Sequence, residues 1–466
     1  MNWRAGVVAG TALLLGGCLV GPDYERPDIP APDDYDLRDG FTTDEGESIV
    51  NLQWFEILGD PDLDTLIRVA LEENRDLLTA IARVEEARAQ LGFERADYFP
   101  QIDGQATGRR GDLFANQIPG LGVQENYVLA ANLSWELDLW GKIRRSNESA
   151  RAQLLQSQEA RNQVLITLIA DVASAYLLLL DLDDRVNIAK ETLRTRTEST
   201  GIIQARFDEG IVPLLDVNQA EIQEYDAAAQ LAALIRDREQ TENLLSILVG
   251  RNPGPVMRNR ELTNLNMPEA VPAGLPSELL ERRPDIREAE AALAAQTALI
   301  GVAKANRFPS LNLTGTLGLA SNDLDNFLSS DNKTWSVGAD FVGPIFDAGK
   351  RRSLVEAEEA RTLQLSYQYE QRILQALAEV EDSLIAIRTL QDELLAREKQ
   401  VAAARSASML SRARYDGGVT SYLEVLESER SKFNAELAES IIRRERLVSL
   451  VELYKALGGG WVPEEQ

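Results

Sequence analysis

The chain has 466 residues, of which 44% are hydrophobic and 26% are charged, and its formal net charge is −27. Such an excess of acidic residues argues against nucleic-acid binding, which needs a basic face. The chain contains no histidine, so Ser-His triads, histidine acid–base catalysis and histidine metal ligands are excluded. We also find no glycine-rich phosphate loop and no cysteine cluster, and therefore expect neither an enzyme nor a metal site.

The chain starts with the pattern of a bacterial lipoprotein signal peptide, which we assign to residues 1–17. Arg4 precedes an apolar run over residues 5–15, and Leu-Gly-Gly then leads to Cys18. The run is too short to span a bilayer as a permanent helix, so we expect its removal. Cys18 is the only cysteine, so no intrachain disulfide can form, and we predict a covalent lipid such as palmitate on it. The alternative is a buried structural cysteine.

Residues 18–50 are rich in proline, aspartate and glycine and show no periodicity, which predicts an extended, lipid-anchored N-terminal segment. Leu19 follows Cys18, at a position where aspartate would favour retention of bacterial lipoproteins in the inner membrane. We therefore expect a lipoprotein that is anchored in the outer membrane.

Residues 51–260 form the first of two predicted repeats, and a β-hairpin is expected at about residues 99–139. Within residues 127–139, odd positions are mostly apolar, whereas even positions include several polar side chains: Asn132, Ser134, Glu136 and Asp138. This two-residue period gives each strand an apolar face and a polar face. Such strands fit the wall of a transmembrane barrel, and the alternative is an ordinary antiparallel sheet on a helical core.

A long helix is predicted after each hairpin. Residues 143–207 contain no proline and one glycine, and residues 351–415 contain neither. At a rise of 1.5 Å per residue, each helix would be a rod of about 100 Å. Apolar residues recur every three or four positions, so each rod is expected to pack against other helices.

Residues 261–466 repeat the same unit, with hairpin strands at about residues 309–346. The matching segments lie about 209 residues apart: Asp76-Leu77 and Asp285-Ile286, Gly92 and Gly301, Phe99-Pro100 and Phe308-Pro309, Gly141-Lys142 and Gly349-Lys350, residues 206–210 and 414–418. A period of this length indicates a duplicated domain, because solenoid repeats are much shorter.

Four strands cannot close a membrane barrel, because the smallest such barrels have eight strands and an open edge in lipid leaves backbone groups unpaired. The chain is therefore expected to oligomerise. A dimer would supply eight strands and a filled barrel, and a trimer would supply twelve strands and leave room for a lumen. Strand counting does not choose between the two.

Several motifs make the chain resemble the TolC-type outer-membrane factors, and within them the OprM/NodT-like efflux lipoproteins. The resemblance extends from Cys18 to Trp461. It rests on four segments of the sequence: Gly-Pro-Asp-Tyr with Arg-Pro at residues 21–27, Trp-Glu-Leu-Asp-Leu-Trp-Gly-Lys at 135–142, Arg-Arg-Pro-Asp-Ile at 282–286 and Leu-Tyr-Lys-Ala-Leu-Gly-Gly-Gly-Trp at 453–461.

This resemblance implies a mainly α fold with a transmembrane β-barrel. It implies a homotrimer whose twelve-stranded barrel in the outer membrane continues as a long α-helical barrel in the periplasm. Members of the family dock onto a periplasmic adaptor (membrane fusion) protein and, through it, onto an inner-membrane pump, for which we expect the RND type. They conduct drugs or other small molecules passively and catalyse no reaction. We therefore expect the outer-membrane channel of a tripartite efflux system.

The resemblance also implies a periplasmic gate at the turns that end the long helices. Leu423 stands at the position of an apolar plug, and Glu424 and Glu427 stand at carboxylate positions. The two glutamates are three residues apart and so share one helix face. Carboxylates gathered around one axis disfavour anions and can bind cations, whereas the alternative is a solvated helix surface. The turns themselves are expected at Gly210, Gly417 and Gly418.

Three further residues belong to the predicted gate. Arg430 and Tyr415 match positions that hold neighbouring helices together in the family, and Asp216 is the first-repeat equivalent of Glu424. The alternative for Arg430 is a weak pair within its own helix. An arginine that partners the tyrosine in some members is Thr420 here, so that contact is expected to be absent.

Two other functions fit part of the sequence. A periplasmic, lipid-anchored coiled-coil adaptor would explain the lipid and the helices, but neither the duplication nor the apolar strands. A lipid-anchored structural tether or enzyme is opposed by the missing histidine and the absence of site motifs.

Overall fold

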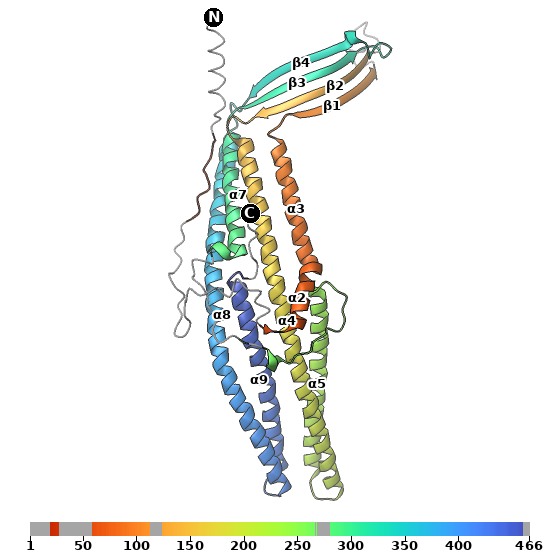
Figure 1. Cartoon of the computed structure of the whole chain (residues 1–466), viewed down its shortest axis with the longest axis vertical. Coiled ribbons are helices and arrows are strands. Elements are labelled where there is room, and N and C mark those ends of the chain that lie inside the picture. Colours follow the sequence, from red (N-terminus) through yellow and green to blue (C-terminus); the bar gives the residue numbers. More distant parts are fainter. Residues whose placement is uncertain (1–18, 28–57, 112–123, 266, 268–279, 460–466) are drawn as a thin grey trace. The chain divides into compact units, whose positions relative to one another are not determined.

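The computed structural model describes residues 19–27, 58–111, 124–265, 267 and 280–459 (Figure 1). The predicted signal peptide, Cys18 and most of the segment 18–50 lie outside these residues. The elements follow in chain order: α2 (Pro61–Glu73), α3 (Arg75–Ala96), β1 (Gln101–Gly111), β2 (Gln124–Leu137), α4 (Lys142–Asp208), α5 (Leu214–Leu248), η3 (Leu262–Asn264), α7 (Pro284–Ala305), β3 (Ser310–Ser321), η4 (Ser330–Asn332), β4 (Lys333–Val342), α8 (Lys350–Asp416) and α9 (Tyr422–Ala456).

The chain forms two compact units. Unit 1 comprises Met1–Ile29, Ala82–Gln158 and Glu288–Gln371, and unit 2 comprises Pro30–Ile81, Glu159–Arg287 and Arg372–Gln466. Each unit therefore takes residues from both halves of the sequence. The repeat boundaries at residues 51–260 and 261–466 stay a prediction from sequence.

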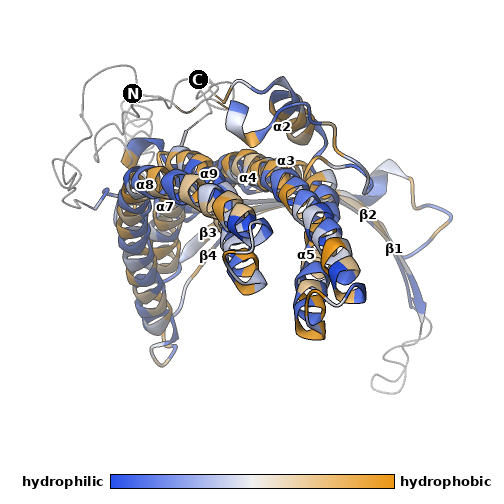
Figure 2. Ribbon diagram, turned by 90° about the horizontal axis from the view of Figure 1, so that it is seen from below, coloured by the Kyte–Doolittle hydropathy of each residue, from blue (hydrophilic) through white to orange (hydrophobic). Residues whose placement is uncertain are grey.

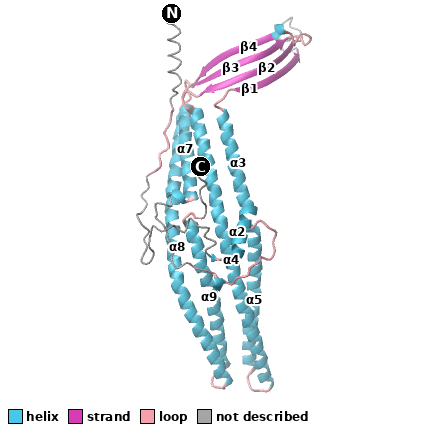
Figure 3. Cartoon of the chain, viewed as in Figure 1, coloured by secondary structure: helices cyan, strands magenta, loops and turns pink. Residues whose placement is uncertain are grey.

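Both predicted hairpins are present, and together they form one antiparallel sheet in unit 1 with the strand order β1-β2-β3-β4 (Figure 3). Asp103, Asn132, Thr316 and Ser336 are register partners across all four strands. The Thr316 hydroxyl donates a hydrogen bond of 2.9 Å to Asn132 Oδ1, so polar side chains meet on this face.

The adjacent row of the sheet is apolar. Ala131, Leu317 and Trp335 are register partners one position further along β2, β3 and β4. Because side chains alternate between the two faces of a strand, the sheet has one polar and one apolar face. Leu317 and Trp335 are 69% and 75% exposed in the single chain, so this apolar face needs an apolar environment.

A short turn connects β2 to α4. The Asp138 carboxylate accepts hydrogen bonds from the backbone N–H groups of Ile143 and Arg144, and so caps the first turn of the helix. Gly141 has φ +80°, a conformation that favours glycine. Trp140 stacks on Phe308 with a centroid distance of 4.6 Å. The motif at residues 135–142 is thus a strand-to-helix turn.

The long helices are equal in length in the two halves of the chain. α4 and α8 have 67 residues each, and α5 and α9 have 35 residues each. A helix of 67 residues is about 100 Å long, as expected from sequence. Hydrophobic and hydrophilic residues are mixed along each long helix (Figure 2). Among the described helices, only α4 has a stretch long and apolar enough to cross a membrane, and 61% of that stretch is buried.

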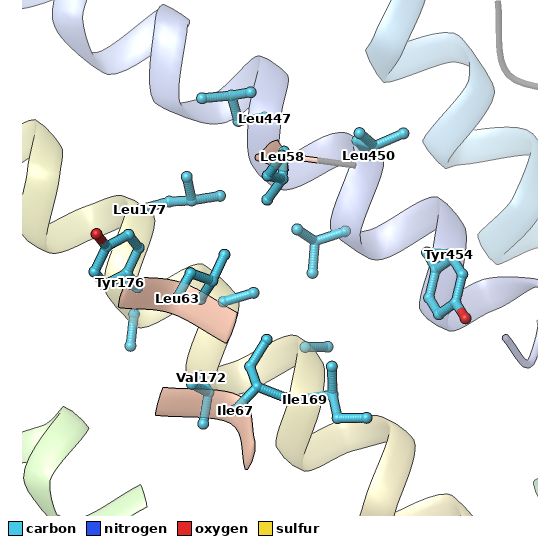
Figure 4. Close-up of a cluster of buried hydrophobic side chains, with 14 of the residues drawn as sticks. Leu58, Leu63, Ile67, Ile169, Val172, Tyr176, Leu177, Leu447, Leu450 and Tyr454 are labelled. Carbon is cyan, nitrogen blue, oxygen red and sulfur yellow. The ribbon is translucent and has the colours of Figure 1, made fainter. Parts of the chain in front are cut away.

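The largest apolar core lies in unit 2, where α2 packs between α4 and α9. Leu63 and Ile67 of α2 meet Val172 and Tyr176 of α4 and Leu450 of α9, all nearly inaccessible to water (Figure 4). Burial of each such side chain contributes about 1.5–3 kcal/mol relative to exposure. The apolar stretch of α4 is therefore explained by this core.

The ends of two sequence motifs meet in unit 2. The buried guanidinium of Arg283 donates to both carboxylate oxygens of Asp285 and, over 2.7 Å, to the Ala456 carbonyl oxygen at the end of α9. Gly458 has φ +71°, and a Cβ there would lie 3.1 Å from Arg283 Cα. The segments at 282–286 and 453–461 thus contact each other directly.

Candidate functional site

The predicted gate lies at the two turns of unit 2, between α4 and α5 and between α8 and α9. The two turns have the same geometry. The Ile211 N–H donates to the Arg206 carbonyl oxygen, and the Val419 N–H donates to the Arg414 carbonyl oxygen. These 6→1 bonds, with the left-handed residue before them, are the Schellman motif that ends a helix.

Two of the three predicted turn glycines have the left-handed conformation. Gly210 and Gly418 have φ of +74° and +71°, with open space around each. A residue with a Cβ is unfavourable there. Gly417 has no positive φ and lies one residue earlier, where its N–H still donates to the Ala413 carbonyl oxygen.

An apolar cluster joins the two hairpin ends. Its buried members come from three helices, and Tyr415 packs against them: Ile203 of α4, Val217 and Ala220 of α5, and Tyr422, Val425 and Leu426 of α9. Burial of these side chains holds the two turns against each other. Tyr415 is therefore part of the packing between the hairpins.

The predicted plug and carboxylates lie on the other side of α9. Leu423 is 60% exposed, and Glu424 and Glu427 are exposed on the same helix face. The Thr420 hydroxyl donates to the Glu424 carboxylate, which also lies 3.6 Å from Arg414 Nε. This face is directed away from the apolar cluster and is free to meet another molecule.

The described contacts of Arg430 and the position of Asp216 both belong to their own helices, α9 and α5. Arg430 Nη2 lies 2.5 Å from Glu427 Oε2, three residues earlier in α9, and both side chains are exposed. Such a pair stabilises a helix by a few tenths of a kcal/mol. Asp216 is in the first turn of α5, as Glu424 is in the first turn of α9. A carboxylate there interacts favourably with the helix dipole.

Charged side chains connect α4 to α8 near the turns. Arg206 Nη2 lies 3.7 Å from Asp416 Oδ1, and Arg412 Nη1 donates over 2.8 Å to the Ser199 hydroxyl. Arg412 also lies 3.8 Å from Glu429, whose pKa is raised by burial although Arg412 opposes that shift. The sequence reasoning missed Arg412, Ser199 and Glu429, since no motif marks them. Arg206 does lie in the repeated segment at 206–210.

A cavity of about 550 Å³ opens on the polar face of the sheet in unit 1. Glu136, Lys142, Asn312 and Asp340 are among its lining residues. Lys142 Nζ lies 3.0 Å from the Glu136 carboxylate. The polar face of the sheet therefore carries charged side chains at this cavity, opposite to the apolar face.

Comparison with known proteins shows to which family a chain with this sheet and these helical hairpins belongs. Residues 66–251 and 275–459 match the outer membrane efflux protein family. The chain belongs to this family. The membership confirms the expectation of a non-enzymatic outer-membrane channel of an efflux system, and it confirms the resemblance to the TolC-type factors.

Individual members of the outer membrane efflux protein family are similar over almost their whole length. The cation efflux system protein CusC of Escherichia coli O157:H7 is 33% identical over 452 residues, which cover 97% of each chain. The solvent efflux pump outer membrane protein SrpC of Pseudomonas putida is 36% identical, with 96% of this chain and 97% of SrpC covered. The solved structure of the outer-membrane channel OprN superposes with a TM-score of 0.85 at 33% identity, covering 95% of this chain and all of that one.

The OprN similarity confirms the predicted fold class, which is mainly helical with two β-hairpins and long helices. The predicted outer-membrane location is confirmed by the same comparisons. The gate residues, the repeat boundaries and the lipid on Cys18 remain predictions.

Proposed function

We propose that three copies of this efflux protein form one passive export channel, in which each copy supplies four of twelve strands. The observation that carries the proposal is the sheet in unit 1. Among the described residues, its outer strands β1 and β4 each have one neighbouring strand, and an unpaired strand edge in lipid leaves backbone groups without partners. β4 of one copy would pair with β1 of the next.

The two faces of the sheet support a trimer over a dimer. An eight-stranded barrel is filled by its own side chains, whereas twelve strands leave space for a lumen. The charged cavity next to Glu136 and Asp340 suits a water-filled interior. The exposed Leu317 and Trp335 of the opposite face suit contact with lipid.

The covalent lipid on Cys18 would anchor the mature chain in the outer membrane, with the long helices extending into the periplasm. A single acyl chain binds membranes weakly and several chains bind stably. Mass spectrometry of the N-terminal peptide tests this part: a lipidated Cys18 is expected, and a free thiol would refute it.

The exposed face formed by Leu423, Glu424 and Glu427 would close the periplasmic end. Three copies of Glu427 around one axis repel one another and attract cations, and Leu423 would supply the apolar constriction. Tyr415, Arg430 and Asp216 would support this gate from the neighbouring turns. A periplasmic adaptor and an inner-membrane pump of the RND type would open it. Cation and solvent efflux are named for the relatives, so small molecules are the expected cargo.

The decisive experiment combines the mass of the purified mature protein in detergent with conductance in planar bilayers. We expect trimers with a small, cation-selective conductance that divalent cations block. Leu423→Ala with Glu427→Ala should raise the conductance and weaken the block. A matched control is Leu78→Ala with Glu85→Ala, because Glu85 pairs with Arg88 at 2.5 Å just as Glu427 pairs with Arg430. A monomer that conducts nothing would refute the channel, and unchanged traces would remove Leu423 and Glu427 from the gate.

A further inference from the structure

Residues 19–27, which follow Cys18, lie against α4 and α7 within unit 1, and Arg145 of α4 is at the centre of their contacts. The Arg145 side chain is almost fully buried. Its Nε donates to the Val20 carbonyl oxygen over 3.4 Å, and its Nη2 donates to the Gly21 carbonyl oxygen over 3.3 Å and to Asp23 Oδ1 over 2.7 Å. Three of its acceptors thus come from a segment more than 120 residues away in the sequence.

The same segment fits a surface made by glycines. Gly21 has φ +107°, and a Cβ there would lie 2.4 Å from Gly301 Cα in α7. A Cβ on Gly301 would lie 2.9 Å from the Val20 carbonyl oxygen and 2.7 Å from Arg145 Cγ. A Cβ on Gly141 would lie 2.5 Å from Leu19 Cδ1. Gly21 and Gly301 are thus needed for the close approach of the segment, because an added Cβ would meet backbone atoms.

We call the surface formed by Gly141, Arg145 and Gly301 the seat. Two further contacts extend the seat along α7. Glu290 accepts hydrogen bonds from the Tyr24 hydroxyl over 3.2 Å and from Arg26 Nη2 over 2.6 Å. At the other end of the segment, the Val20 N–H donates to the Trp140 carbonyl oxygen over 3.2 Å, directly after β2. The segment is therefore held at both ends as well as at Arg145.

Contacts within the helices explain this arrangement only in part, although Arg145 Nη1 also lies 2.7 Å from Glu148 Oε2, three residues later in α4. A cation near the N-terminus of a helix is unfavourable for the helix dipole, yet Arg145 is the fourth residue of α4. Glycine in a helix interior is unfavourable too, yet Gly301 is inside α7. Both residues are explained by the segment that they bind.

The equivalent positions of the duplication do not form a second such surface among the described residues. The equivalents of Gly301 and Gly141 are Gly92 and Gly349, and neither has an atom within 4 Å of an added Cβ. The position equivalent to Arg145 is Ser353, which cannot supply a guanidinium. The seat is therefore a feature of one place in the chain and does not follow from the repeated fold.

We propose that Arg145 and Gly301 form a receptor for the chain's own residues 19–26, and that this seating, rather than the lipid, fixes the start of the mature chain beside the end of β2. The Leu19 side chain lies next to Gly141, in the turn that follows β2. Only the consequence rests on the proposed lipid: the lipid would be attached where the strands end and the helices begin.

A spin label at residue 25 tests the proposal, since Glu25 is exposed within the segment. In lipidated protein the Cys18 sulfur is blocked, so Glu25→Cys supplies one free thiol per chain. Two labels per chain would refute the lipid on Cys18 but would not test the contacts of residues 19–26. Those contacts are then measured in Cys18→Ser protein that is exported with a cleavable non-lipoprotein signal.

The label is expected to be immobilised in both the lipidated and the Cys18→Ser protein. Arg145→Met, which keeps the aliphatic volume, and Gly301→Ala should each raise the ratio of mobile to immobile label at least about tenfold, because a set of buried contacts is lost. Asp23→Asn and Glu290→Gln change contacts outside the buried centre and should raise the ratio of mobile to immobile label a few-fold. Because they leave α4 and α7 intact, they test the proposal even if Gly301→Ala fails to fold.

Gly92→Ala and Arg88→Met are the matched controls, and both should leave the spectrum unchanged. A label that is mobile in the Cys18→Ser protein alone would show that the lipid holds the segment and would overturn the proposal. An unchanged spectrum in Arg145→Met would overturn it as well.

Discussion

The guanidinium of Arg206, near the end of α4, lies over the ring of Tyr415, near the end of α8, with 5.1 Å between its central carbon and the ring centroid. The same guanidinium lies 3.7 Å from Asp416. Arg206 thus connects the two hairpins of unit 2 at the level of the turns. The Thr420 hydroxyl, in the turn that follows α8, donates to the Glu424 carboxylate.

Arg206→Gln should loosen the packing between the two turns, where we propose the periplasmic gate. The substitution removes a cation–π contact of about 0.5–1 kcal/mol and a partly exposed ion pair of similar size. The fraction of time that single channels spend open in planar bilayers should rise several-fold. Arg194→Gln is the control, because Arg194 lies on the same helix but pairs only with Glu191 and Glu198 of α4 in the described structure. An equal effect of both variants would contradict a specific role for Arg206.

The two faces of β3 should respond differently to a charge. Leu317→Arg places a cation on the apolar face, where a charge near the middle of a bilayer costs about 2–4 kcal/mol. The free energy of unfolding, measured by urea titration of the channel recovered from membranes, should fall by about this amount. Thr316→Arg, one residue earlier on the polar face, should fold normally and shift ion selectivity toward anions. Equal folding of the two variants would mean that the apolar face does not meet lipid.

The turn glycines should differ from a glycine within a helix. Gly418→Ala forces a Cβ into a left-handed conformation with φ +71° and should lower the free energy of unfolding by about 1 kcal/mol. Gly201→Ala, within α4 about two turns before its end and with open space around it, should raise it by up to about 1 kcal/mol. Thermal unfolding followed by circular dichroism compares the two. A stabilised Gly418→Ala protein would contradict the observed turn.

The stability of unit 2 should depend on pH through Asp184. Burial, with further contributions from Glu261, Asp181 and Asp183, raises the pKa of Asp184 to about 6 from its ordinary value near 4. The folded state therefore binds this proton more tightly than the unfolded state does. The contribution to stability is complete below about pH 4 and is lost as the pH rises to 6 and above.

Asp184→Asn should remove this dependence and should be more stable than the natural protein at pH 7.5, by about 1–2 kcal/mol. Urea unfolding at pH 4.5, 6 and 7.5 provides the comparison. Asp237→Asn on α5 is the control, because Asp237 is half exposed. Parallel pH curves for Asp184→Asn and the natural chain would refute the assignment.

Local patterns in the sequence determined the elements. Alternating residues at 127–139 predicted β2, runs without proline predicted α4 and α8 within one residue at each end, and the repeated glycines predicted the turns at Gly210 and Gly418. These features depend on neighbours within a few residues, because backbone propensity and face periodicity are local properties. The motifs at residues 21–27, 135–142, 282–286 and 453–461 also indicated the family.

Only the tertiary structure decided which distant residues meet. Arg145 with Gly21, Arg206 with Tyr415, and Arg283 with Ala456 join positions far apart in the sequence. Arginines are frequent in the long helices, and sequence alone does not separate Arg430, which pairs within its own helix, from Arg206, which joins two hairpins. The reason is physical: which face of a long helix is buried, and against what, depends on the packing of all helices together and not on the residues of one.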